Sequence, residues 1–408
     1  MISSFTWLDY SERDRSRALD VIDLFRETGT VDELGIGTIR DSFSDLLFPG
    51  TSTIQTRACY FLLLPWTYLR IERLRISSSQ VAERARREEL SLNERLLQGP
   101  DTEGVFGSSA GKTLKRLPSV AYWGGLGTWG IRVFAGHIDA YYRSLDGFYR
   151  RVDHLSQVPT DPEGRREAAA NWHPHVPAPP KSFPYDVSVA LRRQDSEYLV
   201  DRIAALHSGS LLAELAARPD SDTLDVDWPW DLAGMEGLAS RVCEQLEHGE
   251  LFAVTFHGAA LLYNLMLAEA SEWRERVDFF REELDTWFAE MRAVADRFAS
   301  WDLERFWSVV AQADRRVAYP TRLFVEQWIG HLRRLTAFER LPEQSSARSL
   351  IRERELRLKG GRARLHSPRH LELWGGASGS DKMNYRWSDS RRILTDIFAG
   401  LDRAEDDA

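Results

Sequence analysis

The stretch EWRERVDFFREELDTWFAEMRAVADRFA, residues 272–299, decides the fold class. Its apolar residues recur at steps of three and four, which places them on one face of a helix. The chain shows no succession of short alternating strands, which argues against an all-β or doubly wound α/β fold. The apolar face comprises Trp273, Val277, Phe280, Leu284, Trp287, Met291, Val294 and Phe298.

Helical spacing extends along the chain on both sides of this stretch, so we expect a mostly α protein. Glycines punctuate residues 359–382, which we expect to be a loop. In the N-terminal part, helices are expected at 11–27, 38–47, 53–75, 79–98, 117–129 and 137–155. In the C-terminal part, they are expected at 187–206, 208–217, 231–248, 250–270, 272–299, 301–315, 318–340 and 388–401.

A proline-rich segment divides these two sets of helices. Residues 157–186 contain seven prolines and the phrase WHPHVPAPPKSFP. Such a composition favours an extended linker. We therefore expect an N-terminal helical module over 1–156 and a larger acidic helical domain over 187–408.

Composition excludes several classes of protein. The 408 residues are 43% apolar and 28% charged, which is globular and argues against wholesale disorder. The only two cysteines, Cys59 and Cys243, exclude a disulfide framework and a cysteine-rich zinc site. The start, MISSFTWLDYSERD, meets acids too early for a signal peptide, and the run Tyr60–Trp66 is too short to span a bilayer. We expect a soluble, cytoplasmic protein without membrane contact.

Charge is distributed unevenly along the chain. The net charge is −9, which argues against indiscriminate coating of nucleic acid. Residues 195–304 hold 8 basic and 24 acidic side chains, whereas residues 348–371 hold 8 basic and 2 acidic ones. This asymmetry suggests oriented binding of a polyanion. The alternative is a solvated acidic helical face beside a basic loop.

Four phrases together resemble a known family. They are SSFTWLDYSERDRSRALDVIDLF (3–25), GTVDELGIGTIRDSFSDLLFPGTSTIQTRACYFLLLPW (29–66), KTLKRLPSVAYWGGLGTWGI (112–131) and NYRWSDSRRILTDIFAGL (384–401). They resemble an uncharacterised bacterial family, domain of unknown function 6361. The resemblance implies a component of gene clusters for defence against phage or foreign DNA. It carries no assigned catalytic residues.

The first candidate site follows the break Phe48-Pro49-Gly50. A short helix, a turn and a second helix opening with Thr53, Gln55 and Arg57 have helix-turn-helix proportions. Glutamine suits adenine, arginine suits guanine, and helix N-termini attract phosphate. The alternative is a helical hairpin in which Arg57 forms a structural ion pair.

The second candidate is the stretch 112–131, which has winged-helix character. Its basic residues precede a short helix, a glycine stop and an apolar segment. Lys112, Lys115 and Arg116 would neutralise phosphates, and Ser119 would hydrogen-bond one. The alternative is an amphipathic helix whose aromatic residues lie in the core.

The third candidate is the basic loop RERELRLKGGRARLHSPRH, residues 352–370. Lys359, Arg362, Arg364 and Arg369 flank a Gly-Gly pair that lets the backbone approach a ligand closely. Such a loop could hold a phosphate backbone or an acidic partner. The alternative is that it packs on the acidic helices of its own chain.

Other motifs point to no chemistry. The phrase GSSAGKT at 107–113 has one residue too few for a P-loop and follows no strand. His173 and His175 lie in the proline-rich segment without further ligands nearby, and His257 lies in an apolar helix. No nuclease motif is recognised in the sequence. We therefore name no catalytic residue, metal or cofactor, and lean against an enzyme.

Together these observations favour a non-catalytic accessory protein of a bacterial anti-phage defence system. It would bind DNA or a DNA-processing partner, such as a helicase or nuclease encoded nearby. The opposing interpretation is a protein–protein scaffold or adaptor that makes no contact with nucleic acid. A nuclease with an unrecognised site is a third interpretation.

Overall fold

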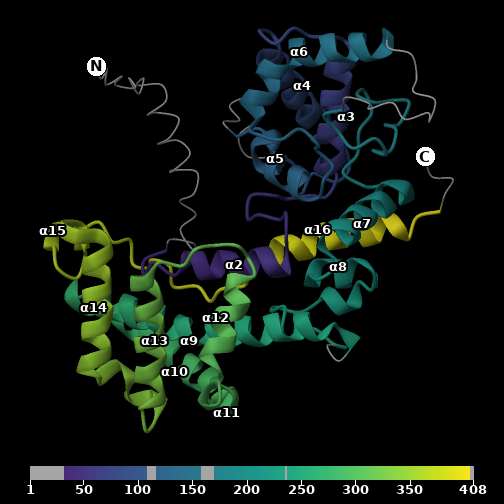
Figure 1. Ribbon diagram of the computed structural model, residues 1–408. Coiled ribbons are helices and arrows are strands. Elements are labelled where there is room, and N and C mark those ends of the chain that lie inside the picture. Colours follow the sequence, from purple (N-terminus) through teal and green to yellow (C-terminus); the bar gives the residue numbers. More distant parts are fainter. Residues whose placement is uncertain (1–31, 108–115, 158–169, 235–236, 405–408) are drawn as a thin grey trace, which may run out of the picture. The chain divides into compact units, whose positions relative to one another are not determined.

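The computed structural model confirms the mostly α fold class (Figure 1). No strand occurs in the part of the chain that it describes, where an isolated bridge pairs Arg132 with Trp172. The helix expected at 11–27 lies outside that part. The described residues are 32–107, 116–157, 170–234 and 237–404.

The described chain forms two compact units, and each is discontinuous in sequence. Unit 1 contains residues 32–42 and 248–383, and unit 2 contains residues 43–247 and 384–404. The residues on both sides of the proline-rich segment therefore belong to unit 2. One reason is that the segment itself is packed: Trp172 is buried, and the indole of Trp66 donates to the carbonyl oxygen of Pro177 at 2.7 Å.

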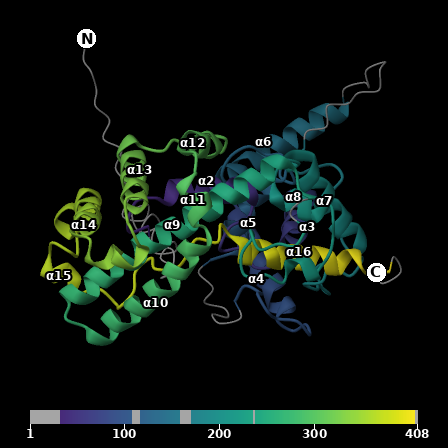
Figure 2. The same cartoon turned by 90° about the horizontal axis from the view of Figure 1, so that it is seen from below.

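In unit 2, α3 packs against α4 and α5, while α16 packs against α7 and α8. The two views in Figures 1 and 2 both show α16 beside α7. Proline at the first turn of α5 supplies a favourable helix start. The helices wholly within unit 2 are α3 (Tyr60–Arg73), α4 (Val81–Leu96), α5 (Pro118–Thr128), α6 (Ile138–Gln157), α7 (Arg193–His207), α8 (Leu211–Ala216), η2 (Asp222–Leu224) and α16 (Trp387–Leu401).

In unit 1, α13 and α14 lie side by side in both views (Figures 1 and 2). The carboxylate of Asp302 caps α12 by accepting two backbone N–H groups. Its helices are α10 (Arg274–Ala293), α11 (Ala295–Ala299), α12 (Leu303–Ala311), α13 (Tyr319–Arg333), η4 (Phe338–Glu343), α14 (Ser345–Lys359), η5 (Gly360–Arg362) and α15 (Pro368–Leu371). The boundaries between the units fall within α2 (Gly37–Leu47) and α9 (Ser240–Ala270).

From Phe280 onward, the apolar stripe of residues 272–299 forms the buried face of α10 and α11, whereas Trp273 is exposed and Val277 is half-buried. Phe280, Leu284, Trp287 and Met291 are each at most 1% exposed. Gly258 of α9 allows Trp287 to approach closely, because a Cβ at this position would overlap the indole ring. The periodicity therefore located the core of unit 1 correctly.

Among the expected boundaries that are wrong, two concern α9 and α14. The helices expected at 231–248 and 250–270 are one helix, α9, which passes through Gly249 without a break. The basic loop expected at 352–370 begins as helix, because α14 continues to Lys359. Ala347 and Ile351, spaced by four, bury one face of α14, and the surrounding charges conceal that spacing in the sequence.

Helix α9 is also long and apolar enough to cross a membrane, which the shorter run Tyr60–Trp66 is not. In this structure 89% of its most apolar window is buried inside the protein. A core helix passes the same test of length and composition, so α9 is weak evidence for a membrane span.

Candidate functional site

The first predicted site lies in the connection between α2 and α3. The helix expected to begin at Thr53 is wrong, because α3 begins at Tyr60. The side-chain amide of Gln55 is buried, donates to the carbonyl oxygen of Gly50 at 3.1 Å and accepts from the N–H of Ser52 at 3.2 Å. Gln55 thus holds its own connection, whereas Thr53 is exposed.

Arg57 is enclosed by carboxylates of its own unit. Its Nε donates to both oxygens of Asp396, at 3.0 and 3.1 Å, and its Nη1 donates to Asp101 at 2.8 Å. Burial opposes the charge of Arg57, but the hydrogen bond and attraction of Asp396 outweigh it and raise the pKa of the guanidinium. Arg57 therefore forms a structural ion pair, which is the alternative interpretation of this candidate site.

The second predicted site is only partly described, because Lys112 and Lys115 lie outside the described residues, as does most of GSSAGKT. Arg116 is half-buried. Ser119 is buried, and its backbone N–H donates to the Glu89 carboxylate at 2.9 Å. The winged-helix character expected for this region is not confirmed, since the segment after α5 forms only the isolated bridge.

Unit 1 brings two residues of the third predicted site together on one buried carboxylate. Lys359 and Arg364 both contact Glu33, which is 5% exposed, with Arg364 Nη1 at 2.7 Å from Oε1. Lys359 also contacts Glu355, whose carboxylate accepts from the hydroxyl of Tyr263 at 2.6 Å. We call these five side chains the Glu33 network.

Lys359 also donates to the Tyr263 hydroxyl at 3.0 Å, so the Glu33 network is continuous. It contains two carboxylates and two cations. Burial raises the pKa of Glu33, but hydrogen bonds from Lys359 and Ser378 and attraction to the two cations outweigh it, and the pKa is lowered. The network is charge-balanced, as expected if these cations neutralise acidic groups of their own chain.

The remaining residues of the third site face solvent. Arg362 and Arg369 are exposed, and so is Arg357 at the end of α14. Within the described chain, none of these three forms an ion pair with a carboxylate. We call Arg357, Arg362 and Arg369 the exposed arginine set.

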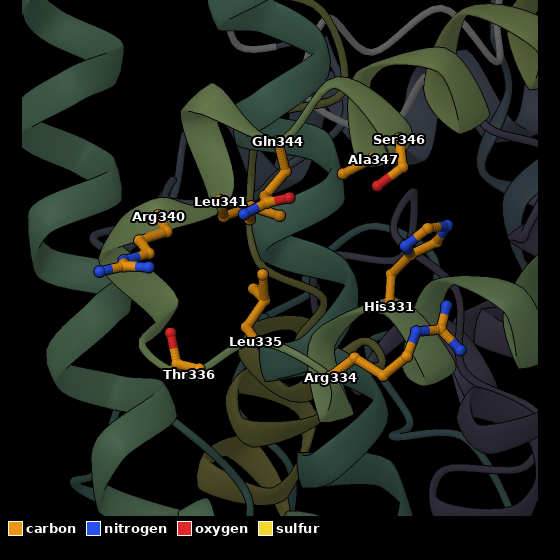
Figure 3. A pocket seen from close by; sticks show the side chains of 9 residues that line it. All are labelled: His331, Arg334, Leu335, Thr336, Arg340, Leu341, Gln344, Ser346 and Ala347. Carbon is orange, nitrogen blue, oxygen red and sulfur yellow. The ribbon is translucent and has the colours of Figure 1, made fainter.

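Sequence reasoning missed a polar pocket between the end of α13, η4 and the start of α14 (Figure 3). Its volume is about 310 Å³. Figure 3 shows His331 and Arg334 next to one another and Arg340 on the opposite side, with Gln344 between them. Ser346 contributes a hydroxyl from α14. The expected single helix over 318–340 would have separated these residues, and no local motif marks them.

A groove of about 650 Å³ between α13 and α14 adjoins this pocket. The two cavities share His331, Arg334 and Ser346, but the groove also carries the carboxylates of Glu326 and Glu353. Burial and then the charge of Arg334 lower the pKa of His331. The imidazole is therefore neutral near pH 7 and can donate or accept a hydrogen bond.

The remaining histidines do not form a metal centre. The Nε2 of His173 contacts Arg202 at 3.1 Å, and its ring lies beside that of His175. His257 faces Glu290 at 3.9 Å. Among the described residues, no group of three or more His, Cys, Asp or Glu is placed to hold a metal ion.

These observations define a mostly helical protein of two discontinuous units with cationic surface features in unit 1. The chain belongs to the family of unknown function DUF6361, whose model matches residues 2–400. No curated protein and no solved structure matches the chain.

Proposed function

We propose that this protein is a non-catalytic, cytoplasmic accessory protein of a bacterial anti-phage defence system, and that it binds DNA through the exposed arginine set. The proposal rests on a difference among the basic side chains of residues 348–370: some are paired with a buried carboxylate and others are exposed to solvent. Lys359 and Arg364 neutralise Glu33, whereas Arg357, Arg362 and Arg369 face solvent without a carboxylate. The defence setting rests on the resemblance of the sequence.

DNA contact is proposed for this set because three of the N-terminal candidates are enclosed. Gln55, Arg57 and Ser119 are each at most 9% exposed. A guanidinium group that faces solvent can pair with a phosphate without first losing an internal partner. The net charge of −9 restricts such binding to a local patch, so it will be oriented and strongly salt-dependent.

A salt titration tests the proposal. We expect binding to duplex DNA to weaken steeply between low and moderate salt. Replacing Arg357, Arg362 and Arg369 by Gln should reduce the slope of log affinity against log salt by about 2 to 3, because each lost phosphate contact removes roughly 0.9. The matched control replaces Arg143, Arg150 and Arg151, three exposed arginines of α6, by Gln.

The control changes the net charge equally and should leave most of the salt dependence in place. Equal loss in the two triple variants, or no binding at low salt, would contradict DNA recognition by the exposed arginine set. The second result would favour the scaffold or adaptor. The enclosed positions of Gln55, Arg57 and Ser119 already support that alternative. Its partner would be a helicase or nuclease encoded nearby, and co-purification with the products of neighbouring genes would test it.

A further inference from the structure

The start of α10 exposes two large aromatic side chains that lie around one arginine. Trp273 and Phe279 are each 40% exposed. The Cζ atom of Arg276 lies 5.6 Å from the centre of the Trp273 ring and 5.3 Å from the centre of the Phe279 ring. The three side chains therefore form one continuous surface, and we call them the α10 patch. Exposed surfaces that combine aromatic rings with arginine are typical of protein–protein contacts.

The α10 patch is held in place by its own unit. The ring of Trp273 contacts the buried ring of Trp374 edge-on, with 6.0 Å between the ring centres. Gly376 lets the backbone lie against the patch, because a Cβ at this position would be 2.8 Å from Arg276 Nε and 3.1 Å from the Trp273 ring. Arg276 forms no ion pair among the described residues, so its guanidinium is stabilised by cation–π contacts. Side chains that are ordered before binding lower the entropic cost of association.

The charges around the exposed phenylalanine ring are mostly negative. Residues three or four positions apart are neighbours on a helix surface, so Phe279 is flanked by Glu275, Glu282 and Glu283. None of these three carboxylates forms an ion pair within the described chain. The surroundings of Phe279 therefore carry three negative charges against the one positive charge of Arg276.

We propose that the α10 patch binds a basic amphipathic segment of a partner protein. The rings of Trp273 and Phe279 would contact the apolar side chains of that segment, and the free carboxylates would pair with its lysine and arginine side chains. The proposal does not depend on DNA binding, because it uses a different surface of unit 1.

The charge of this region disfavours three other occupants. Residues 272–285 hold 6 acidic and 3 basic side chains, so DNA and an anionic membrane would be repelled. A second copy of the chain would bring the same carboxylates face to face in a two-fold contact. A basic partner is the occupant whose charge is complementary.

Fluorescence anisotropy with the full chain and three labelled synthetic peptides tests this proposal. The first peptide has leucine and lysine at amphipathic helical spacing over about 18 residues, long enough to form a helix. The second carries glutamate in place of each lysine, and the third has the composition of the first in an order without an apolar face. The first should bind at least tenfold more tightly than the others. Equal binding of the first and third peptides, or absence of binding by the first, would overturn the proposal.

Variants locate the binding at the patch. Phe279→Ala should weaken binding of the basic amphipathic peptide by about tenfold or more, because an exposed aromatic anchor is removed. Tyr319→Ala, at an aromatic ring of unit 1 that is 74% exposed and lies outside the patch, is the matched control. Thermal unfolding of both variants checks that the fold is retained. Equal peptide binding by the two variants would contradict the site.

A charge reversal tests the role of the carboxylates. The double variant Glu275→Lys and Glu282→Lys should lose the basic peptide and bind the acidic one instead. The control, Glu304→Lys and Glu353→Lys, also replaces one exposed acid in the first turn of a helix and one in the middle of a helix. It should keep the preference for the basic peptide. If the first double variant also kept that preference, the proposal would be wrong.

The other occupants are tested with Phe279→Ala. Binding of the wild-type chain to phosphatidylserine vesicles, or self-association in sedimentation experiments, would overturn the proposal if Phe279→Ala abolished it. The DNA titration separates this surface from the exposed arginine set. Phe279→Ala should leave DNA binding unchanged, and the triple variant of the exposed arginine set should leave peptide binding unchanged.

Discussion

Each unit contains a deeply buried glutamate, and these two glutamates, Glu33 and Glu89, have opposite surroundings. In unit 1, the Glu33 network surrounds its carboxylates with Lys359 and Arg364. In unit 2, Glu89 is buried and Glu72 is half-buried among aromatic side chains, and neither forms an ion pair within the described residues. Glu89 is fully buried and accepts hydrogen bonds from the Tyr68 hydroxyl and the backbone N–H of Ser119.

The pKa shifts follow this difference. Burial raises the pKa of Glu89 and of Glu72, and hydrogen bonds only partly oppose it. The donors to Glu72 are neutral: the Tyr141 hydroxyl at 2.6 Å, the Asn171 amide and the Trp172 indole. In Glu33 the nearby cations reverse the effect of burial. For Glu33 and Glu89, the presence or absence of nearby cations decides the direction of the shift, whereas burial raises the pKa of Asp396 although Arg57 pairs with it.

The largest effect is expected for Glu33→Ala. The substitution leaves Lys359 and Arg364 without their shared carboxylate although both are about three-quarters buried. The free energy of unfolding of unit 1 should fall by about 3 kcal/mol, the range measured when one partner of a buried pair is removed. Urea unfolding measures this loss. Glu372→Ala, at an exposed carboxylate of the same unit, is the control. A loss equal to that of the control would show that solvent already screens the pair.

The next effect is expected for Tyr68→Phe in unit 2. The hydroxyl lies 2.8 Å from both Glu89 and the hydroxyl of Tyr142, and both contacts are buried. Its removal should cost about 1–3 kcal/mol of unfolding free energy, because a buried acceptor loses its donor. Amide hydrogen exchange in α4 reports the loss locally. Tyr185→Phe, at an exposed ring of the same unit, should change little.

Glu89→Gln should change the pH dependence of stability in unit 2. Since the pKa of Glu89 is raised in the folded state, its favourable contribution is complete below the unfolded pKa of about 4.3 and is lost as pH rises through the folded value. The Glu89→Gln variant should therefore become more stable relative to wild type as pH rises above about 4. Glu33 should show the opposite sign, since its lowered pKa makes its contribution disappear as pH falls. If the unfolding free energies of the Glu89→Gln and Glu33→Gln variants changed with pH in the same direction relative to wild type, the proposed difference between the two glutamates would be wrong.

The smallest effect is expected for Arg362→Gln. This side chain is exposed and makes no ion pair among the described residues, so unfolding free energy should change by less than about 0.5 kcal/mol. Thermal unfolding measures it. A loss close to that of Glu33→Ala would place Arg362 in the internal network and remove it from the exposed arginine set.

The sequence predicts the helices best where an apolar stripe is complete. The stripe from Phe280 to Phe298 identifies the core of unit 1, because a 3.6-residue period is a local property. The period is obscured in α14, where Arg354 and Glu355 are buried through their partners, as Glu355 is through Tyr263. Buried charges look like surface charges in a sequence.

The candidate site is harder to predict, because its residues meet only in three dimensions. Lys359 and Glu33 are 326 residues apart, and no spacing rule connects them. The pocket between α13, η4 and α14 combines His331, Arg340 and Ser346, and its shape depends on where α13 ends. From the sequence, the basic residues of the C-terminal loop could be either exposed or internally paired. In the structure, Lys359 and Arg364 are internally paired, whereas the exposed arginine set faces solvent.

The long-range pairs also govern how this chain is made. During synthesis, Glu33 cannot pair with Arg364 until 331 further residues have been added, and Arg57 cannot pair with Asp396 until 339 further residues have been added. Both units therefore stay incomplete until nearly all of the chain has left the ribosome. The apolar window of α9 lacks its later neighbours during that interval, which invites aggregation unless a chaperone protects the nascent chain. A message truncated before codon 355 should yield material for proteolysis instead of a separately folded domain.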